Sequence, residues 1–326
     1  MLTVADLPPV RGTYTAQAPL APFTWMRVGG PAGVLFRPAD EADLADFLKH
    51  KPAHIPHFVI GAASNLIIRD GGLPDTVVIK LAKGFGDLDA HGQTLTAGAA
   101  QLDLNVAKFA AKNGIGGLSF LAGVPGTIGG AVRMNAGART TAANAHIAGG
   151  ETADRLKHAR VLDPNGTIHT LTPQDMGMSY RHNDLPDDWI ITAAVFEGAA
   201  QGEGEGTSPP APLATEDPAT PAALMKEIEG VLAYRNDNQP TKARTCGSTF
   251  KNPDGQSAWK LVDAAGGRGL RRGDAEMSDF HCNFLLNLGH ATAADLEDLG
   301  DDIRARVRAQ SGIDLQWEVK RVGNRA

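Results

Sequence analysis

The chain has 326 residues, which is long for one domain and suggests about two at ~150 residues each. Hydrophobic residues make up 42% of it, enough for sizeable cores. The net charge of −6 argues against a nucleic-acid partner or an anionic membrane, because both favour basic surfaces.

Targeting and covalent features are sparse. The start, MLTVADLPPVRG, lacks the basic residues and apolar core of a secretion signal. No stretch approaches the ~20 apolar residues of a membrane-spanning helix. The two cysteines, Cys246 and Cys282, are too few for a disulfide framework, and the histidines show no metal-ligand spacing. We expect a cytoplasmic protein without a metal.

After a lead-in of residues 1–21, the segment 22–197 alternates β-branched runs with glycine-rich turns. The runs at 58–60, 77–79 and 190–192 predict buried strands.

Two helices are expected between these strands. Asp40 would cap one that buries Leu44 and Phe47. Asp103 would cap another that carries Val106 and ends near Gly114. The pattern indicates an α+β or α/β domain.

Residues 198–221 are rich in Gly, Pro, Ala and Glu and poor in large apolar side chains, which predicts a flexible linker. The remaining segment, 222–326, is expected to form a C-terminal domain. Its most periodic helix would begin at Thr292 and end at Gly312, with Leu296, Leu299, Ile303 and Val307 forming the apolar stripe.

Two glycine-rich segments stand out in the first domain, at 61–65 directly after a strand and at 116–137. Glycines let backbone amides approach an anion closely, and a pyrophosphate is the usual occupant. The spacing is not the GxGxxG of a Rossmann dinucleotide site. The alternative is that the glycines only permit tight turns.

Several longer motifs carry a family resemblance. VGGPAGVLFRP, GAASNLIIRDGG, GGLSFLAGVPGTIGGAVRMNAGA, and CGSTFKNP with AWKLVDAAGGRGLR closely resemble segments of the UDP-N-acetylenolpyruvoylglucosamine reductase (MurB) family. The resemblance covers about residues 22–323. It implies an α+β fold of the vanillyl-alcohol-oxidase (PCMH) type, with two α+β subdomains that bind FAD and a C-terminal α+β subdomain that binds the substrate.

On this resemblance, the loops 61–65 and 122–130 hold the FAD pyrophosphate, and the turn 133–137 lies near the isoalloxazine. The implied cofactor-binding residues are Gly61, Ala62, Ala63, Ser64, Asn65, Ser119, Ala122, Gly123, Val124, Pro125, Gly126, Thr127, Gly129, Gly130, Asn135, Ala136 and Gly137. We expect FAD to be bound non-covalently, because both cysteines lie in the last domain and the glycine loops contain no histidine.

The implied reaction is the NADPH-dependent reduction of an enolpyruvyl nucleotide sugar to UDP-N-acetylmuramate, a step of peptidoglycan precursor synthesis. Hydride adds to a vinyl ether conjugated to a carboxylate, so the site needs a cation beside the developing enolate and a proton donor. The resemblance assigns the donor to Ser248 and the stabilisation to Arg181 and Glu318. Without their motifs, all three would be interpreted as turn or surface residues.

The implied substrate contacts are Tyr180, Arg235, Gln239, Lys251 and Asn252. An alternative for Arg235 is a purely structural role, because a cation suits the end of a helix. Cys246 is close to Ser248 in sequence, but an inert buried thiol is favoured because no thiolate-stabilising pattern surrounds it.

The chain also departs from the family. GAASN stands where relatives read GGGSN, and alanine is costly there if the second or third position needs a positive φ. Residues 139–148 resemble an insertion. The only tyrosines are Tyr14, Tyr180 and Tyr234, so the substrate-covering tyrosine loop of one branch is absent and the short-loop branch is indicated.

Two other functions remain open on the same scaffold. One is a flavin oxidase or alcohol dehydrogenase, since a fold does not fix a function. The other is a flavin-binding relic that has lost turnover. For the favoured reductase we expect a monomer whose partner is the small-molecule substrate.

Overall fold

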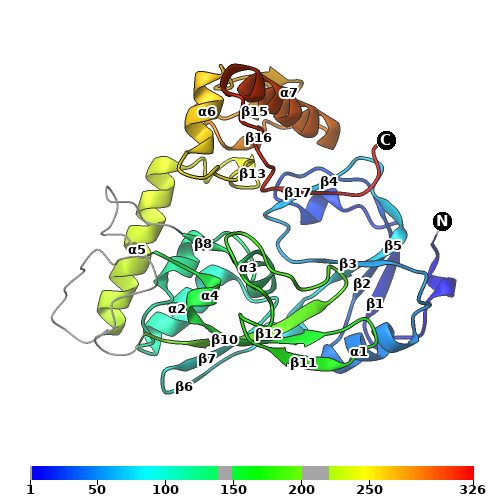
Figure 1. Ribbon diagram of the computed structural model, residues 1–326. Helices are drawn as coiled ribbons and strands as arrows, with labels where there is room; N and C mark the ends of the chain where they lie inside the picture. Colours follow the sequence, from blue (N-terminus) through cyan, green and yellow to red (C-terminus); the bar gives the residue numbers. More distant parts are fainter. Residues whose placement is uncertain (1, 139–148, 200–219) are drawn as a thin grey trace.

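The computed structural model describes residues 2–138, 149–199 and 220–326 (Figure 1). The predicted insertion at 139–148 and most of the predicted linker at 198–221 lie outside these residues. Among the described helices, none is long and apolar enough to cross a bilayer.

The first unit is a four-stranded sheet in the order β1-β2-β5-β3. Its strands are β1 (Thr13–Ala16), β2 (Ala32–Arg37), β5 (Leu73–Lys80) and β3 (His57–Ile60). β2, β5 and β3 run parallel, and β1, from the lead-in segment, pairs antiparallel with β2. Helix α1 (Glu41–His50) connects β2 to β3. Its predicted cap is confirmed, because the backbone N of Asp43 donates to Asp40 Oδ1 at 2.9 Å.

The second unit is a five-stranded antiparallel sheet in the order β11-β10-β12-β7-β6. The strands are β6 (Leu88–His91), β7 (Thr94–Gly98), β10 (Leu156–Leu162), β11 (Ile168–Leu171) and β12 (Ile190–Glu197). The shorter elements are α2 (Asp103–Lys112), η4 (Ser119–Gly123), α3 (Ile128–Met134), β8 (Gly137–Ala138), β9 (Gly150–Glu151) and α4 (Thr152–Arg155). Phe36 of the first sheet and Phe196 of the second belong to one hydrophobic core, so the two units fold against each other.

The prediction that Asp103 caps α2 is wrong. The N-cap is Leu102, and Asp103 is the first residue inside the helix. Its backbone N donates to the carbonyl of Gly126 at 3.2 Å, so its main chain is tied to the second glycine loop. The side chain turns toward that loop, where both carboxyl oxygens are buried without a hydrogen-bond partner among the described residues.

Helix α5 (Pro221–Asn238) belongs to the second unit by its packing, although it lies in the segment assigned to the C-terminal domain. It packs against α2 and η4. Leu224, Ile228 and Val231 enter the core shared by the two sheets. In Figure 1, α5 stands beside this unit and leads up to the C-terminal one.

The C-terminal unit has its own core and a four-stranded sheet in the order β13-β16-β15-β14. Its elements are β13 (Arg244–Thr245), α6 (Ala258–Ala264), β14 (Arg271–Arg272), β15 (Ala275–Met277), β16 (Leu285–Asn287) and α7 (Ala293–Ser311). The predictions for α7 are confirmed. Thr292 caps it, its predicted apolar stripe is buried, and Gly312 ends it with φ +73°.

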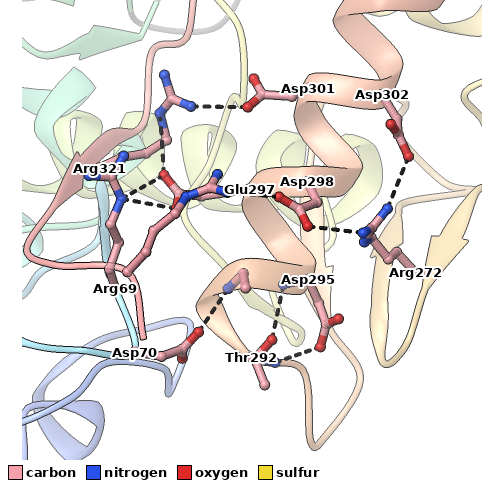
Figure 2. A network of polar contacts seen from close by, with 12 residues as sticks. Arg69, Asp70, Arg272, Thr292, Asp295, Glu297, Asp298, Asp301, Asp302 and Arg321 are labelled. Atoms are coloured by element: carbon pink, nitrogen blue, oxygen red, sulfur yellow. Dashed lines mark hydrogen bonds and ion pairs between the residues drawn. The ribbon is translucent and has the colours of Figure 1, made fainter.

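The chain end fastens this unit to the first one. β17 (Lys320–Val322) pairs in parallel with β4 (Leu66–Ile68). Just beyond β4, the two oxygens of Asp70 accept the backbone N–H groups of Ala293 and Ala294 at 2.9 Å each, at the start of α7 (Figure 2).

One turn further along α7, Glu297 is completely buried and pairs with Arg69 at 3.0 Å. Arg321 lies 3.8 Å from the same carboxylate (Figure 2). Arg325 lies 3.7 Å from it. Several cations therefore compensate one buried anion at the contact between the units.

Candidate active site

A cavity of about 890 Å³ is lined by residues from all three units. Its volume is in the range typical of cofactor and ligand sites. Most of the predicted cofactor-binding residues form its wall: Gly61, Ala62, Ala63, Ser64, Asn65, Gly123, Val124, Pro125, Gly126, Thr127, Gly129, Gly130, Ala136 and Gly137. The structure thus brings both glycine loops to one cavity.

The two loops approach each other too closely for larger residues. A Cβ atom on Gly61 would collide with the Thr127 hydroxyl. One on Gly126 would lie 3.0 Å from Asp103 Oδ2 and 3.3 Å from Ser64 Oγ. Backbone without side chains at the cavity wall lets the diphosphate of a dinucleotide approach the backbone amides closely. The two unpartnered carboxyl oxygens of Asp103 lie beside this backbone. The residues present therefore fit FAD.

Three predicted cofactor residues lie outside the cavity lining, namely Ser119, Ala122 and Asn135. The Ser119 hydroxyl donates to Glu227 Oε2 on α5 at 2.7 Å. Asn135 ends α3 in the left-handed conformation and donates to the carbonyl of Ser179 at 3.0 Å. These side chains hold neighbouring segments in place.

The altered first loop contains a strained alanine. Ala63 has φ +51°, whereas Ala62 does not have a positive φ. The third position of GAASN therefore adopts the conformation that costs an alanine roughly 1–2 kcal/mol.

Arg181 and Glu318 form an ion pair at the cavity wall. Arg181 Nε lies 3.2 Å from Glu318 Oε1, and each side chain is only 14% exposed. The other guanidinium nitrogens donate to the carbonyls of Asn135 at 3.2 Å and Gly137 at 2.8 Å. Arg181 itself has φ +55°, a strained conformation held by a tight turn between Ser179 and His182.

Burial raises the pKa of Glu318, while Arg181 and Lys251 act in the opposite direction. The pair thus combines a fixed positive charge with a carboxyl group whose ionisation is partly suppressed by desolvation.

Ser248 is placed beside Glu318 by the backbone. The N–H of Glu318 donates to the carbonyl of Thr249 at 2.8 Å, and that of Lys251 to the carbonyl of Gln316 at 2.8 Å. Ser248 and Glu318 both line the cavity. Within the described part of the chain, the Ser248 hydroxyl makes no hydrogen bond, so it is available to a ligand.

The predicted substrate residues are divided by the structure. Arg235, Gln239 and Asn252 line the cavity, whereas Tyr180 and Lys251 do not. Arg235 Nε donates to Gln239 Oε1 at 3.3 Å, and burial lowers the pKa of Arg235. The ring of Tyr180 lies 5.1 Å from the guanidinium carbon of Arg181.

Cys246 is buried as expected for a structural thiol. Its Sγ donates to the carbonyl of Leu66 at 3.2 Å, and burial raises its pKa to about 12. A thiol with this pKa is not a nucleophile near neutral pH. Among the described residues, no group of three or more His, Cys, Asp or Glu side chains could hold a metal ion.

Sequence reasoning missed a set of aromatic and charged residues in the lining. They are Trp25, His57, Asp103, Asp187, Asp188, Trp189, Tyr234, Trp259, His281, Phe284 and Lys320. Trp259 lies in the AWKL motif and Tyr234 adjoins Arg235, so these two carried a local signal. The segment 187–189 carried none, because only the folding of the second sheet brings it to the cavity.

Two family models match successive parts of this chain. Residues 239–322 match the model of the UDP-N-acetylenolpyruvoylglucosamine reductase C-terminal domain, and residues 32–172 match the model of an FAD binding domain. The predicted α+β fold and the FAD cofactor are thereby confirmed.

Whole-chain relatives extend the match. A UDP-N-acetylenolpyruvoylglucosamine reductase from Azorhizobium caulinodans is 51% identical over 98% of this chain and 94% of its own. One from a Bradyrhizobium strain is 49% identical over 99% and 96%. The crystal structure of the corresponding Thermus caldophilus reductase (MurB) superposes with a TM-score of 0.74 at 32% identity, covering 97% of this chain and all of that one. This chain belongs to the UDP-N-acetylenolpyruvoylglucosamine reductase family.

Proposed function

We propose that the protein reduces UDP-N-acetylglucosamine enolpyruvate to UDP-N-acetylmuramate, with electrons from NADPH passing through bound FAD. The observation that carries the proposal is that Ser248 and the Arg181–Glu318 ion pair line the same cavity. Both glycine loops line this cavity as well.

FAD, when bound, supplies hydride transfer. The chain's own residues must then stabilise the charge that develops on the substrate carboxylate and deliver a proton to carbon. Arg181 suits the first task, because its guanidinium is fixed by Glu318 and two backbone carbonyls before any ligand arrives. A preorganised cation needs no reorganisation during the reaction.

Ser248 suits the second task, because its hydroxyl lines the cavity and has no competing partner among the described residues. A hydroxyl is a weak acid, so it donates only to a strongly basic enolate and needs help to regain its proton. The backbone N–H of Glu318 donates to the carbonyl of Thr249, the residue after Ser248, and burial raises the pKa of the Glu318 carboxyl group. We assign to Glu318 the polarisation of the same intermediate.

The diphosphate of the nucleotide sugar calls for a cation away from the reacting carbon. Arg235 is partly buried in the cavity wall, and it forms no ion pair with any described residue. An anionic ligand would compensate this desolvated charge. Gln239 fixes its orientation, and Asn252, which also lines the cavity, is assigned to the sugar and phosphates. Lys251 lies outside the lining, so we assign to it only a positive charge near Glu318 that attracts the phosphates.

The proposal is tested in two steps without oxygen. NADPH should bleach the bound flavin, and the enolpyruvyl nucleotide sugar should then restore the yellow colour. Reoxidation by oxygen but not by this substrate would favour the oxidase, and a flavin that NADPH does not reduce would favour the relic.

Three further assignments accompany this function as predictions. FAD is held without a covalent bond, so acid precipitation should release the colour into the supernatant. The protein is cytoplasmic and a monomer. Size-exclusion chromatography of the pure protein would test the oligomeric state. It belongs to the short-loop branch of the family.

A further inference from the structure

Asp103 carries a buried carboxyl group for which the fold provides no partner. The residue is 0% exposed, and neither oxygen makes a hydrogen bond with any described residue. It nevertheless belongs to the wall of the FAD cavity. An unpartnered buried acid costs free energy in the unliganded protein, so its position suggests a role that needs a ligand.

The surroundings of Asp103 point to one end of the cofactor. Its Oδ2 lies beside Gly126 of the second glycine loop, with Ser64 of the first loop across the same small space. These are the two loops expected to hold the FAD diphosphate. Asp103 therefore lies where a dinucleotide presents acceptor oxygens rather than where it presents the flavin ring.

Helix α2 packs against η4, α5 and β6. On α5, Glu227 accepts from the Ser119 hydroxyl and Arg235 donates to Gln239, and on β6 Asp89 pairs with His91.

The charged groups near the glycine loops also have other partners. Lys80 on β5 donates to the carbonyl of Gly61, and His57 on β3 contacts the carbonyl of Asp188. Arg133 on α3 donates to the carbonyls of Leu185 and Pro186. On α2 itself, Lys108 is more than one helical turn away.

The carboxyl group is consequently buried without a compensating cation, and this burial raises its pKa well above the usual value. A neutral carboxylic acid has an O–H donor, which an ionised carboxylate lacks. An ionised group at this place would instead repel the negative diphosphate.

We propose that Asp103 is a cofactor-binding residue that stays neutral when FAD is bound and donates a hydrogen bond to the diphosphate. The proposal rests on FAD binding alone and not on the reductase reaction. FAD affinity should fall as rising pH ionises the group. This pH dependence is opposite in sign to that expected of a carboxylate that binds the cofactor in its ionised form.

The test measures binding to the apoprotein by quenching of flavin fluorescence, from mildly acidic to mildly basic pH, with ADP as a competitor. In the parent, affinity for both ligands should fall as the pH rises. Asp103→Ala should bind FAD about 10- to 100-fold more weakly at low pH, the range for losing one hydrogen bond to a charged group. Asp103→Asn keeps a donor that cannot ionise, so its affinity should stay near the parent's low-pH value and lose the pH dependence.

Controls separate this role from a folding defect. Asp163→Asn removes a carboxylate from the β10–β11 turn, outside the cavity lining, and should leave binding unchanged. Melting curves of the apoproteins verify that each variant is folded.

Several results would overturn the proposal. One is parent-like affinity in Asp103→Ala, and another is an Asn variant as weak as the Ala variant. Affinity that rises with pH would mean that an ionised Asp103 accepts from cofactor hydroxyls. ADP binding that is indifferent to Asp103 would remove the diphosphate assignment. None of these outcomes depends on whether the enolpyruvyl substrate is reduced.

Discussion

The Nε atom of Arg181 lies 3.2 Å from Oε1 of Glu318, although 137 positions separate the two residues. Arg181 comes from a tight turn of the second unit, and Glu318 lies two residues before β17, which returns from the C-terminal unit. The candidate catalytic pair therefore exists only when these units are docked. Its geometry depends on contacts far from the cavity.

Arg181→Lys should reduce turnover about 100- to 1000-fold, the usual cost of removing one preorganised stabiliser of developing charge. An ammonium cannot contact Glu318 and two backbone carbonyls with the geometry of a guanidinium. Stopped-flow absorbance should show normal flavin reduction by NADPH and slow reoxidation by substrate. Near-normal reoxidation would mean that the charge acts only from a distance.

Ser248→Ala should stop the cycle after flavin reduction. The variant should fold, bind FAD and bleach with NADPH at nearly the parent rate, because that step needs no proton delivered to carbon. Reoxidation by the enolpyruvyl substrate should slow about 100- to 10,000-fold. Thr249→Ser is a matched control, since the neighbouring buried hydroxyl donates no proton to substrate in this scheme. Parent-like reoxidation in Ser248→Ala would end the assignment of Ser248 as the acid.

Ala63→Gly should stabilise the protein by about 1 kcal/mol, because glycine adopts φ +51° without the penalty that alanine carries. Ala62→Gly is the matched control in the same loop. Ala62 has no positive φ, so its replacement should destabilise by about 0.5–1 kcal/mol through added unfolded-state entropy. Denaturant unfolding of the two apoproteins should give opposite signs. Equal effects would show that backbone strain at position 63 is unimportant.

Glu297→Ala should destabilise the protein by about 3–5 kcal/mol, because it leaves Arg69, Arg321 and Arg325 clustered without their buried anion. Asp302 also lies on α7, is 58% exposed and pairs with Arg272 of β14. Asp302→Ala should therefore lower the free energy of unfolding by less than about 1 kcal/mol. Thermal unfolding would measure both. A small effect of Glu297→Ala would mean that β17 alone fastens the C-terminal unit.

The stability of the apoprotein should fall with rising pH because of Asp103. The folded chain holds this proton above pH 3.8, the ordinary value, whereas the unfolded chain releases it there. Between the pKa of Asp103 in the unfolded chain and its higher pKa in the folded chain, the folded state binds more protons. The free energy of unfolding therefore decreases as the pH rises through this range. Asp103→Asn should flatten this slope, which melting curves at several pH values would show. Identical slopes in parent and variant would place the ionisation elsewhere.

The sequence by itself determined what depends on near neighbours. The strands at 58–60, 77–79 and 190–192, the cap of α1 and the whole of α7 were predicted from patterns only a few residues long. The glycine loops and their FAD ligand were also predicted, because their motifs are contiguous.

Tertiary structure decided the rest, for reasons of packing and charge. Nothing local to α5 states that its apolar side chains fill the core of the second unit rather than that of the C-terminal one. Asp103 had the sequence signature of a helix cap, yet the approach of the Gly126 loop placed it one residue inside the helix and buried it. Similarly, the resemblance named Arg181, Ser248 and Glu318 separately, but only the return of the chain through β17 brings them to one wall. Contacts between distant segments depend on how whole units dock, and no short stretch of sequence contains that information.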